Sequence, residues 1–116
     1  MSTLSLHKRR KRIISRVRAQ VIGSPTRPRV AVYRSHIHIS AQAIDDSKGI
    51  TLAAAYDDSV KNAKNKTERA FAVGQELAKK LREKGLTAVV FDRRYYRYSG
   101  RVKALAEGLR SVEISL

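Results

Sequence analysis

Residues 65–85 specify a helix more completely than any other segment, and this helix constrains the fold most. Asn65 stands three residues before Glu68, which is the spacing of a capping box at a helix N-terminus. Gly85 follows a basic stretch, as is typical of a helix that ends in a left-handed cap. The apolar side chains form one stripe: Ala70, Phe71, Gly74, Leu77, Ala78 and Leu81. Because such a stripe has to be buried against another layer, the rest of the chain must supply that layer.

Strand patterns before the helix predict that this layer is a β-sheet. Residues 30–34 are rich in strand-forming residues. Residues 36–44 alternate, and the side chains predicted to face the core are Ile37, Ile39, Ala41 and Ala43. Residues 45–49 carry turn chemistry, and residues 50–56 are typical of the return strand of a hairpin. We expect three antiparallel strands here.

The segment after the helix adds a fourth strand and a second helix. Residues 86–91 form a continuous apolar run, which is typical of an interior strand covered on both faces. Residues 101–110 repeat apolar side chains at helical spacing, and residues 111–116 are expected to form a short strand or a tail. The predicted fold is α/β, a single domain with a mixed β-sheet packed with helices.

Positive charge indicates a polyanionic partner. The chain carries 25 Lys and Arg against 10 Asp and Glu, a net charge of +15, and no acidic residue precedes Asp45. Residues 6–22 predict a basic helix, which the breakers at 23–29 end. We therefore divide the chain into a helical or flexible basic arm, residues 1–26, and an α/β RNA-binding domain, residues 27–116. An Arg-rich, acid-poor N-terminus also occurs in mitochondrial transit peptides, so an organellar source stays open.

Catalytic and metal sites find little support in the sequence. There is no cysteine, which excludes disulfides, thiolate metal ligands and cysteine nucleophiles. His36 and His38 form an H-x-H pair, but His7 is the only other histidine, and a closed metal site needs three or four ligands. No apolar run nears the ~20 residues of a membrane span. We expect no enzyme, cofactor or metal, and neither a membrane nor a small-molecule partner.

The positive signal is the stretch FDRRYYRYSGRVK at residues 91–103, where five cations alternate with three tyrosines. Arginine forks match phosphate oxygens, and tyrosine rings stack on bases. At least one tyrosine, Tyr96 or Tyr98, is expected to fold onto the core. A strand that ends in such a loop predicts a contact with RNA.

Three motifs in order resemble the bacterial-type family of large-subunit ribosomal protein eighteen, which binds 5S ribosomal RNA (rRNA). They are RPRVAVYRSHIHISAQAIDDSKGITLAAA (27–55), NKTERAFAVGQELAKKLREKG (65–85) and AVVFDRRYYRYSGRVKALAEGLR (88–110). The resemblance implies a cytoplasmic ribosomal protein that binds 5S rRNA and helps attach it to 23S rRNA in the central protuberance, beside a neighbouring 5S-binding protein. Arg94 and Tyr95 depart from the family pattern, because they replace a pair of glycines.

The residue pattern and the resemblance together give the candidate rRNA-binding residues. They are Lys8, Arg9, Arg10, Lys11, Arg12, Arg16, Arg18, Arg27, Arg29, Arg34, Ser35, His36, His38, Asn65, Lys66, Thr67, Arg93, Arg94, Tyr95, Tyr96, Arg97, Tyr98, Gly100, Arg101 and Lys103. Two alternatives stay open. One is a metal-dependent nuclease on a related scaffold that uses Asp92 with another carboxylate, and the other is a non-specific basic RNA chaperone.

Overall fold

The computed structural model describes residues 8–14, 22–57 and 65–116. After a short helix at residues 8–14, the elements are β1 (Arg29–Arg34), β2 (Ile39–Asp45), β3 (Ile50–Tyr56), α2 (Lys66–Glu83), β4 (Val90–Asp92) and α3 (Gly100–Ser111). The α/β prediction is confirmed. Much of the predicted arm lies outside the described residues, so the domain boundary at residue 26 stays a prediction. No helix in the described parts of the chain is long and apolar enough to cross a membrane.

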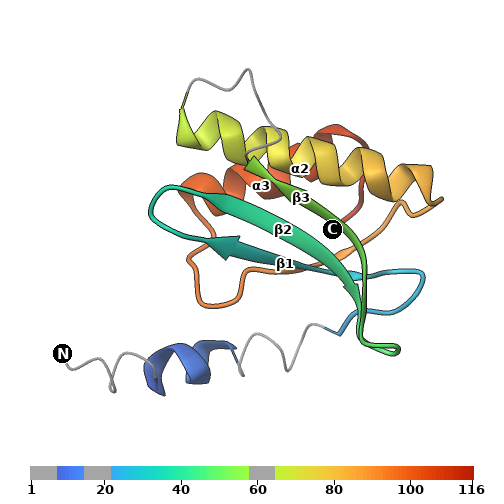
Figure 1. Cartoon of the computed structure of the whole chain (residues 1–116), viewed down its shortest axis with the longest axis horizontal. Helices are drawn as coiled ribbons and strands as arrows, with labels where there is room; N and C mark the ends of the chain where they lie inside the picture. Colours follow the sequence, from blue (N-terminus) through green and yellow to red (C-terminus); the bar gives the residue numbers. More distant parts are fainter. Residues whose placement is uncertain (1–7, 15–21, 58–64) are drawn as a thin grey trace.

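The four strands form one mixed sheet in the order β3-β2-β1-β4. β1 pairs antiparallel with β2, and β2 pairs antiparallel with β3, as the hairpin pattern predicts. β4 pairs parallel with β1, as is usual for strands joined through a helix. Helices α2 and α3 cover one face of this sheet, and the helix at residues 8–14 lies on the opposite side (Figure 1).

The core lies between the sheet and the two helices. Its largest fully buried side chains include Leu77 and Leu81 from α2 and Leu105 and Leu109 from α3, all on the stripes that the sequence predicts. The helices cross in close contact at glycines. A Cβ added at Gly108 would stand 2.1 Å from the carbonyl oxygen of Phe71. A side chain at this crossing would force the helices apart.

The predicted caps of α2 are confirmed. Oδ1 of Asn65 accepts a hydrogen bond of 2.8 Å from the backbone N–H of Glu68. At the other end, Gly85 has a φ of 77°, and the N–H of Leu86 reaches back to the carbonyl of Leu81 at 2.9 Å. These bonds satisfy backbone groups that helix ends otherwise leave unpaired.

Two strand predictions need correction. β2 begins at Ile39 rather than residue 36, and the side chain of Ile37 is 58% exposed instead of buried. Residues 35–38 form a turn instead, closed by a 2.8 Å bond from the N–H of Ser35 to the carbonyl of His38. β4 is an edge strand of three residues rather than an interior strand. The C-terminal tail covers the start of its apolar run, since Ser115 bridges to Ala88.

Candidate nucleic-acid interface

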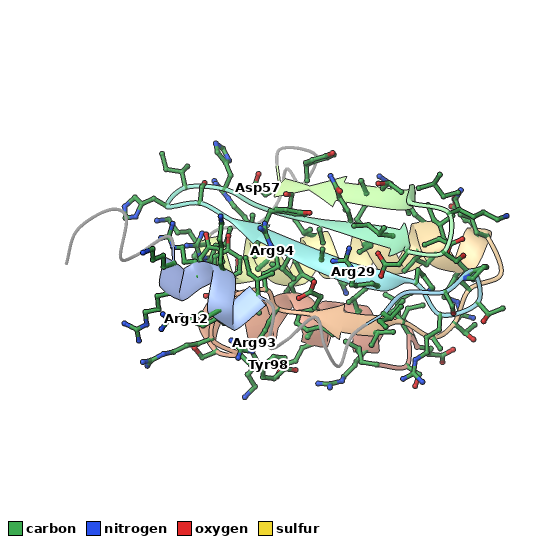
Figure 2. The ribbon with its side chains drawn as sticks, turned by 90° about the horizontal axis from the view of Figure 1, so that it is seen from below. Arg12, Arg29, Asp57, Arg93, Arg94 and Tyr98 are labelled. Atoms are coloured by element: carbon green, nitrogen blue, oxygen red, sulfur yellow. The ribbon has the colours of Figure 1, made fainter. Side chains whose placement is uncertain are left out.

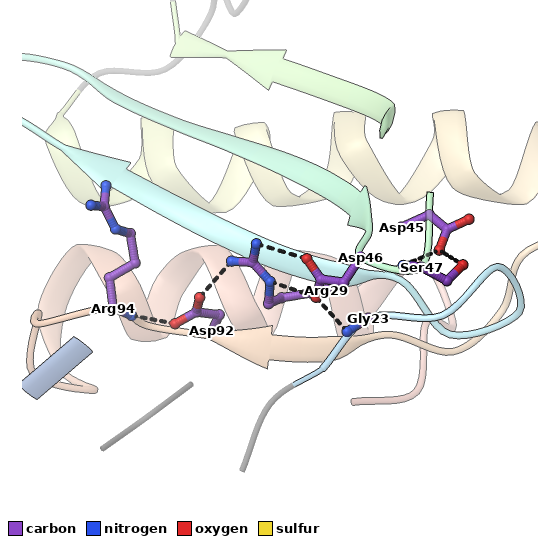
Figure 3. Close-up of polar contacts among 7 residues, drawn as sticks. All are labelled: Gly23, Arg29, Asp45, Asp46, Ser47, Asp92 and Arg94. Carbon is purple, nitrogen blue, oxygen red and sulfur yellow. Dashed lines mark hydrogen bonds and ion pairs between the residues drawn. The ribbon is translucent and has the colours of Figure 1, made fainter. Parts of the chain in front are cut away.

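The basic loop starts from a buried ion pair at the end of β4. Asp92 is fully buried, and its Oδ2 accepts a 2.7 Å hydrogen bond from Nη1 of Arg29 (Figure 3). Asp46 holds the rest of the same guanidinium through bonds of 3.0 and 3.1 Å. Burial alone lowers the pKa of Arg29, but the hydrogen bonds and charges of Asp46 and Asp92 outweigh it and raise this pKa.

Arg29 therefore has a structural role in the folded protein, and its expected contact with RNA stays a prediction. It is only 7% exposed, and both carboxylates that hold it lie within the protein. Asp92 is likewise committed, which leaves it unsuited to binding a catalytic metal. Among the described residues, no group of three or more metal-ligating side chains occurs. Asp45 has the predicted turn role, because its Oδ1 accepts bonds from the N–H and hydroxyl of Ser47.

Arg94 has an unusual backbone conformation at the start of the loop. It takes a φ of 59°, in the left-handed region that glycine usually occupies. Its N–H donates to Oδ1 of Asp92 at 2.8 Å, which fixes the turn. Its guanidinium lies 4.5 Å from the ring centre of Tyr33 and 5.8 Å from that of Tyr95. The loop therefore has a left-handed residue at position 94, and the side chain of this residue makes two cation–π contacts.

Tyr96 ties the loop to the end of β1. Its hydroxyl accepts from the N–H of Arg34 and donates to the carbonyl of Arg34, both at 2.8 Å. The side chain is 6% exposed, which confirms that one loop tyrosine folds onto the core. Burial, with a contribution from Tyr95, raises the pKa of Tyr96. Arg93 donates from Nη1 to the carbonyl of Tyr96, so both residues shape the loop.

The basic arm reaches this loop through Arg10. Its guanidinium lies 4.7 Å from the ring centre of Tyr95, and the Tyr95 and Tyr96 rings lie 4.4 Å apart. The exposed cations of the helix at residues 8–14 are Lys8, Arg9, Lys11 and Arg12, and Figure 2 shows the Arg12 side chain on this helix. The candidates Arg16 and Arg18 lie outside the described residues.

A groove forms where the arm, the end of β1 and the first turn of α3 meet. Its volume is about 350 Å³, and it is lined by Arg10, Arg34, Ser35, His36, Tyr95, Tyr96 and Arg101. All seven belong to the set expected from sequence, although they come from segments far apart in the chain. Nη1 of Arg101 is buried and has no hydrogen-bond partner among the described residues. Burial, and then the charge of Arg34, lower the pKa of Arg101.

The candidate RNA-binding residues in the turn at residues 35–38 and at the start of α2 lie close together beside this groove. Nζ of Lys66 donates to the carbonyl of His36 at 2.9 Å. Nδ1 of His38 lies 3.1 Å from a carboxylate oxygen of Asp57. Asn65 uses its side chain as the helix cap, and Thr67 is exposed.

The remaining candidates are more dispersed. Nε of Arg27 donates to the carbonyl of Val89 at 3.3 Å, away from the loop. The hydroxyl of Tyr98 pairs with Arg110 at 3.0 Å, and its side chain is 42% exposed. The last three candidate RNA-binding residues are exposed to solvent: Arg97, Gly100 and Lys103.

Sequence reasoning missed Tyr33 as part of this surface. It pairs with Ser40 across the sheet, and Ser40 pairs with Tyr56, so the two tyrosines flank a small residue on the side away from α2 and α3. They are 36% and 49% exposed. The alternation in β2 predicts that Ser40 points away from the core. It could have indicated that Tyr33 and Tyr56 lie beside Ser40 only if the pairing register of the strands had been known.

Comparison with known proteins places the chain in a family. The family of ribosomal L18 proteins of archaea, bacteria, mitochondria and chloroplasts matches residues 4–116. Large ribosomal subunit protein uL18 of Limosilactobacillus reuteri is 52% identical over 105 residues, which cover 90% of this chain and 89% of that protein. The uL18 of Chloroherpeton thalassium is 52% identical over 114 residues, with 95% of both chains covered. The uL18 of Staphylococcus aureus strain JH9 is 46% identical over 112 residues, covering 95% of this chain and 94% of the relative. On this similarity across almost its whole length, the chain belongs to the ribosomal L18 family.

Proposed function

We propose that this protein binds 5S rRNA and helps attach it to 23S rRNA in the central protuberance, beside a neighbouring 5S-binding protein. As a member of the ribosomal L18 family it is a structural constituent of the large ribosomal subunit, and the family is not enzymatic. The finer statement, which RNA it binds and where, is the proposal.

The observation that supports it most is the convergence of cations and tyrosines. Arg10 from the arm, Arg34 from β1, Tyr95 from the loop and Arg101 from α3 line one groove. Cations of this kind neutralise phosphates, and the aromatic rings add stacking surface. Helices α2 and α3, which pack on the sheet around the core, supply the rigid support.

The affinity would come mainly from phosphate neutralisation. If six to ten phosphates are contacted, affinity falls by about 10³ to 10⁵ between about 50 and 200 mM salt. An affinity that does not change with salt would contradict this electrostatic account. Specificity would come from the fit of the fixed loop to the shape of the RNA.

Competition binding tests the proposal. Labelled 5S rRNA is displaced from the protein with unlabelled 5S rRNA or with an equal mass of an unrelated folded RNA. We expect 5S rRNA to compete more strongly. Equal competition would remove the specific role and favour the non-specific chaperone alternative. Co-sedimentation of 5S with 23S rRNA only in the presence of the protein and its neighbour tests the attachment step.

The arm is expected to contribute to binding rather than to folding. No residue of the helix at 8–14 belongs to the hydrophobic core cluster. Removing residues 1–18 should therefore weaken RNA binding and leave a cooperative unfolding transition. Loss of that transition would show that the arm stabilises the fold.

A further inference from the structure

We propose that the groove between the end of β1 and the first turn of α3, called here the arginine groove, holds a single phosphate group of the bound RNA. Among its lining residues, Arg34 and Arg101 would donate hydrogen bonds to the phosphate oxygens. The inference rests on the proposed RNA-binding function and deepens it, because it names one chemical group and the residues that receive it.

The first argument is the free donor of Arg101. A buried charged N–H without an acceptor is costly, and native proteins leave few such groups. Nη1 of Arg101 is buried and unpartnered within the described part of the chain, although Arg101 lines an open groove. Because Arg101 also lines the open groove, a rotation of its guanidinium toward an acceptor oxygen there would satisfy this donor.

The second argument is uncompensated charge. Burial and then the charge of Arg34 lower the pKa of Arg101, whereas Asp57 and Tyr96 act in the opposite direction without reversing the shift. Asp57 is itself engaged by His38 and by the N–H of Ile39 at 3.2 Å. Among the residues that the structure describes, no carboxylate lines the groove. An anion between the two arginines would turn their repulsion into attraction.

The third argument is that the Arg34 side of the groove is fixed before binding. The Tyr96 hydroxyl accepts from the N–H and donates to the carbonyl of Arg34, and the Arg34 guanidinium lies 4.9 Å from the Tyr96 ring centre. Arg101 lies in the first turn of α3, which contains no acidic residue. The partial positive charge at that helix end adds to the potential. Little conformational freedom would be lost when the anion enters.

The ligand chemistry follows from the lining. A groove of arginines repels metal cations, and guanidinium forks match the tetrahedral oxygens of a phosphate. The groove is open rather than enclosed, so a phosphodiester within a continuous strand can enter it. Arg10, held on Tyr95, stands at the same groove from the side of the arm.

The test measures 5S rRNA affinity against salt for the full chain and three variants: Arg101→Gln, Arg101→Lys and Lys79→Gln. Lys79 is an exposed cation of α2 and serves as the charge-matched control. Arg101→Gln should weaken binding about tenfold or more and flatten the salt dependence by about one unit of log–log slope. Arg101→Lys should keep the slope of log affinity against log salt, because lysine retains the positive charge. It should lose part of the RNA affinity, because lysine lacks the two-pronged guanidinium group. Lys79→Gln should change neither.

A second measurement uses the protein without RNA. Thermal unfolding is followed with inorganic phosphate and with chloride at equal ionic strength. Phosphate should raise the Tm of the native chain more than chloride does, and Arg101→Gln should lose this difference. If Arg101→Gln does not fold, the native protein is titrated with phosphate and followed by NMR. The signal of the Arg101 side chain should then shift at a lower phosphate concentration than the signals of other arginines.

The outcomes separate this inference from the proposed function. If the native chain binds 5S rRNA tightly and the Arg101→Gln and Lys79→Gln variants bind it equally well, the phosphate site is overturned and the proposed function stands. If the native chain does not bind 5S rRNA, the proposed function fails and the phosphate measurements decide. Phosphate stabilisation that depends on Arg101 would then support an anion site for another polyanion, and its absence would overturn the site.

Discussion

Replacing Asp92 by Asn tests whether this residue supports structure or chemistry. In the native protein its two oxygens accept bonds from Nη1 of Arg29 and from the N–H of Arg94, at 2.7 and 2.8 Å. Breaking a buried ion pair costs about 3–5 kcal/mol. Arg29 keeps its two bonds to Asp46, and the Asn oxygen can still accept one hydrogen bond. We therefore expect the low end of that range, about 3 kcal/mol.

Urea unfolding followed by circular dichroism measures this loss. With a denaturant slope of about 1–3 kcal/mol/M, a loss of about 3 kcal/mol should lower the urea midpoint by about 1–3 M. Glu113→Gln is the control, because Glu113 pairs with Arg82 at 3.2 Å but its side chain is 83% exposed. That exposed pair should contribute less than about 0.5 kcal/mol.

RNA affinity should be unchanged by Asp92→Asn under conditions where the variant is folded. A stability loss below about 1 kcal/mol, together with lost RNA affinity, would refute the structural role. Magnesium-dependent RNA cleavage by the native chain that Asp92→Asn abolishes would do the same and would favour the nuclease alternative.

Three further substitutions test the loop and the helix crossing. Arg94→Gly should be more stable than Arg94→Ala by about 1 kcal/mol in urea unfolding, because only glycine tolerates the φ of 59° without strain; equal stabilities would show that this backbone is unstrained. Tyr96→Phe should cost about 1 kcal/mol at neutral pH. Since the pKa of Tyr96 is raised in the folded state, its contribution is complete below about pH 10 and is lost as pH rises through the raised value, so the gap to Tyr96→Phe should shrink there. A gap that stays constant at high pH would contradict this. Gly108→Ala should destabilise by about 1–3 kcal/mol in thermal unfolding, because its Cβ would collide with the carbonyl of Phe71, and a neutral change would show that the crossing can relax.

Much of the fold could be predicted because the relevant signals are local. The stripe and caps of α2, the hairpin of β2 and β3 and the apolar face of α3 all follow from spacing along the chain. Ile37 continues the strand alternation but lies in a turn that Ser35 and His38 close. The apolar run before β4 is covered partly by the tail, and periodicity cannot distinguish this from an interior strand.

The sequence predicted which types of residue form the candidate site. It did not predict how these residues are arranged in space. Arg29 carries the same charge as Arg34 in the sequence, and only the tertiary contacts with Asp46 and Asp92 identify Arg29 as a structural arginine. The sequence could not give the backbone path of the loop at Arg94, and the structure shows a positive φ there. The groove depends on contacts between distant segments, which no local pattern reports.

The most direct test of the account is amide hydrogen exchange of the protein with and without 5S rRNA. Slower exchange is predicted in the helix at residues 8–14, the turn at residues 35–38, the loop at residues 93–99 and the first turn of α3. The outer surface of α2 around Lys79 should be unaffected. Protection confined to that surface, with the loop and turn unchanged, would contradict the claim that the arm, the end of β1 and the loop form the RNA-binding face.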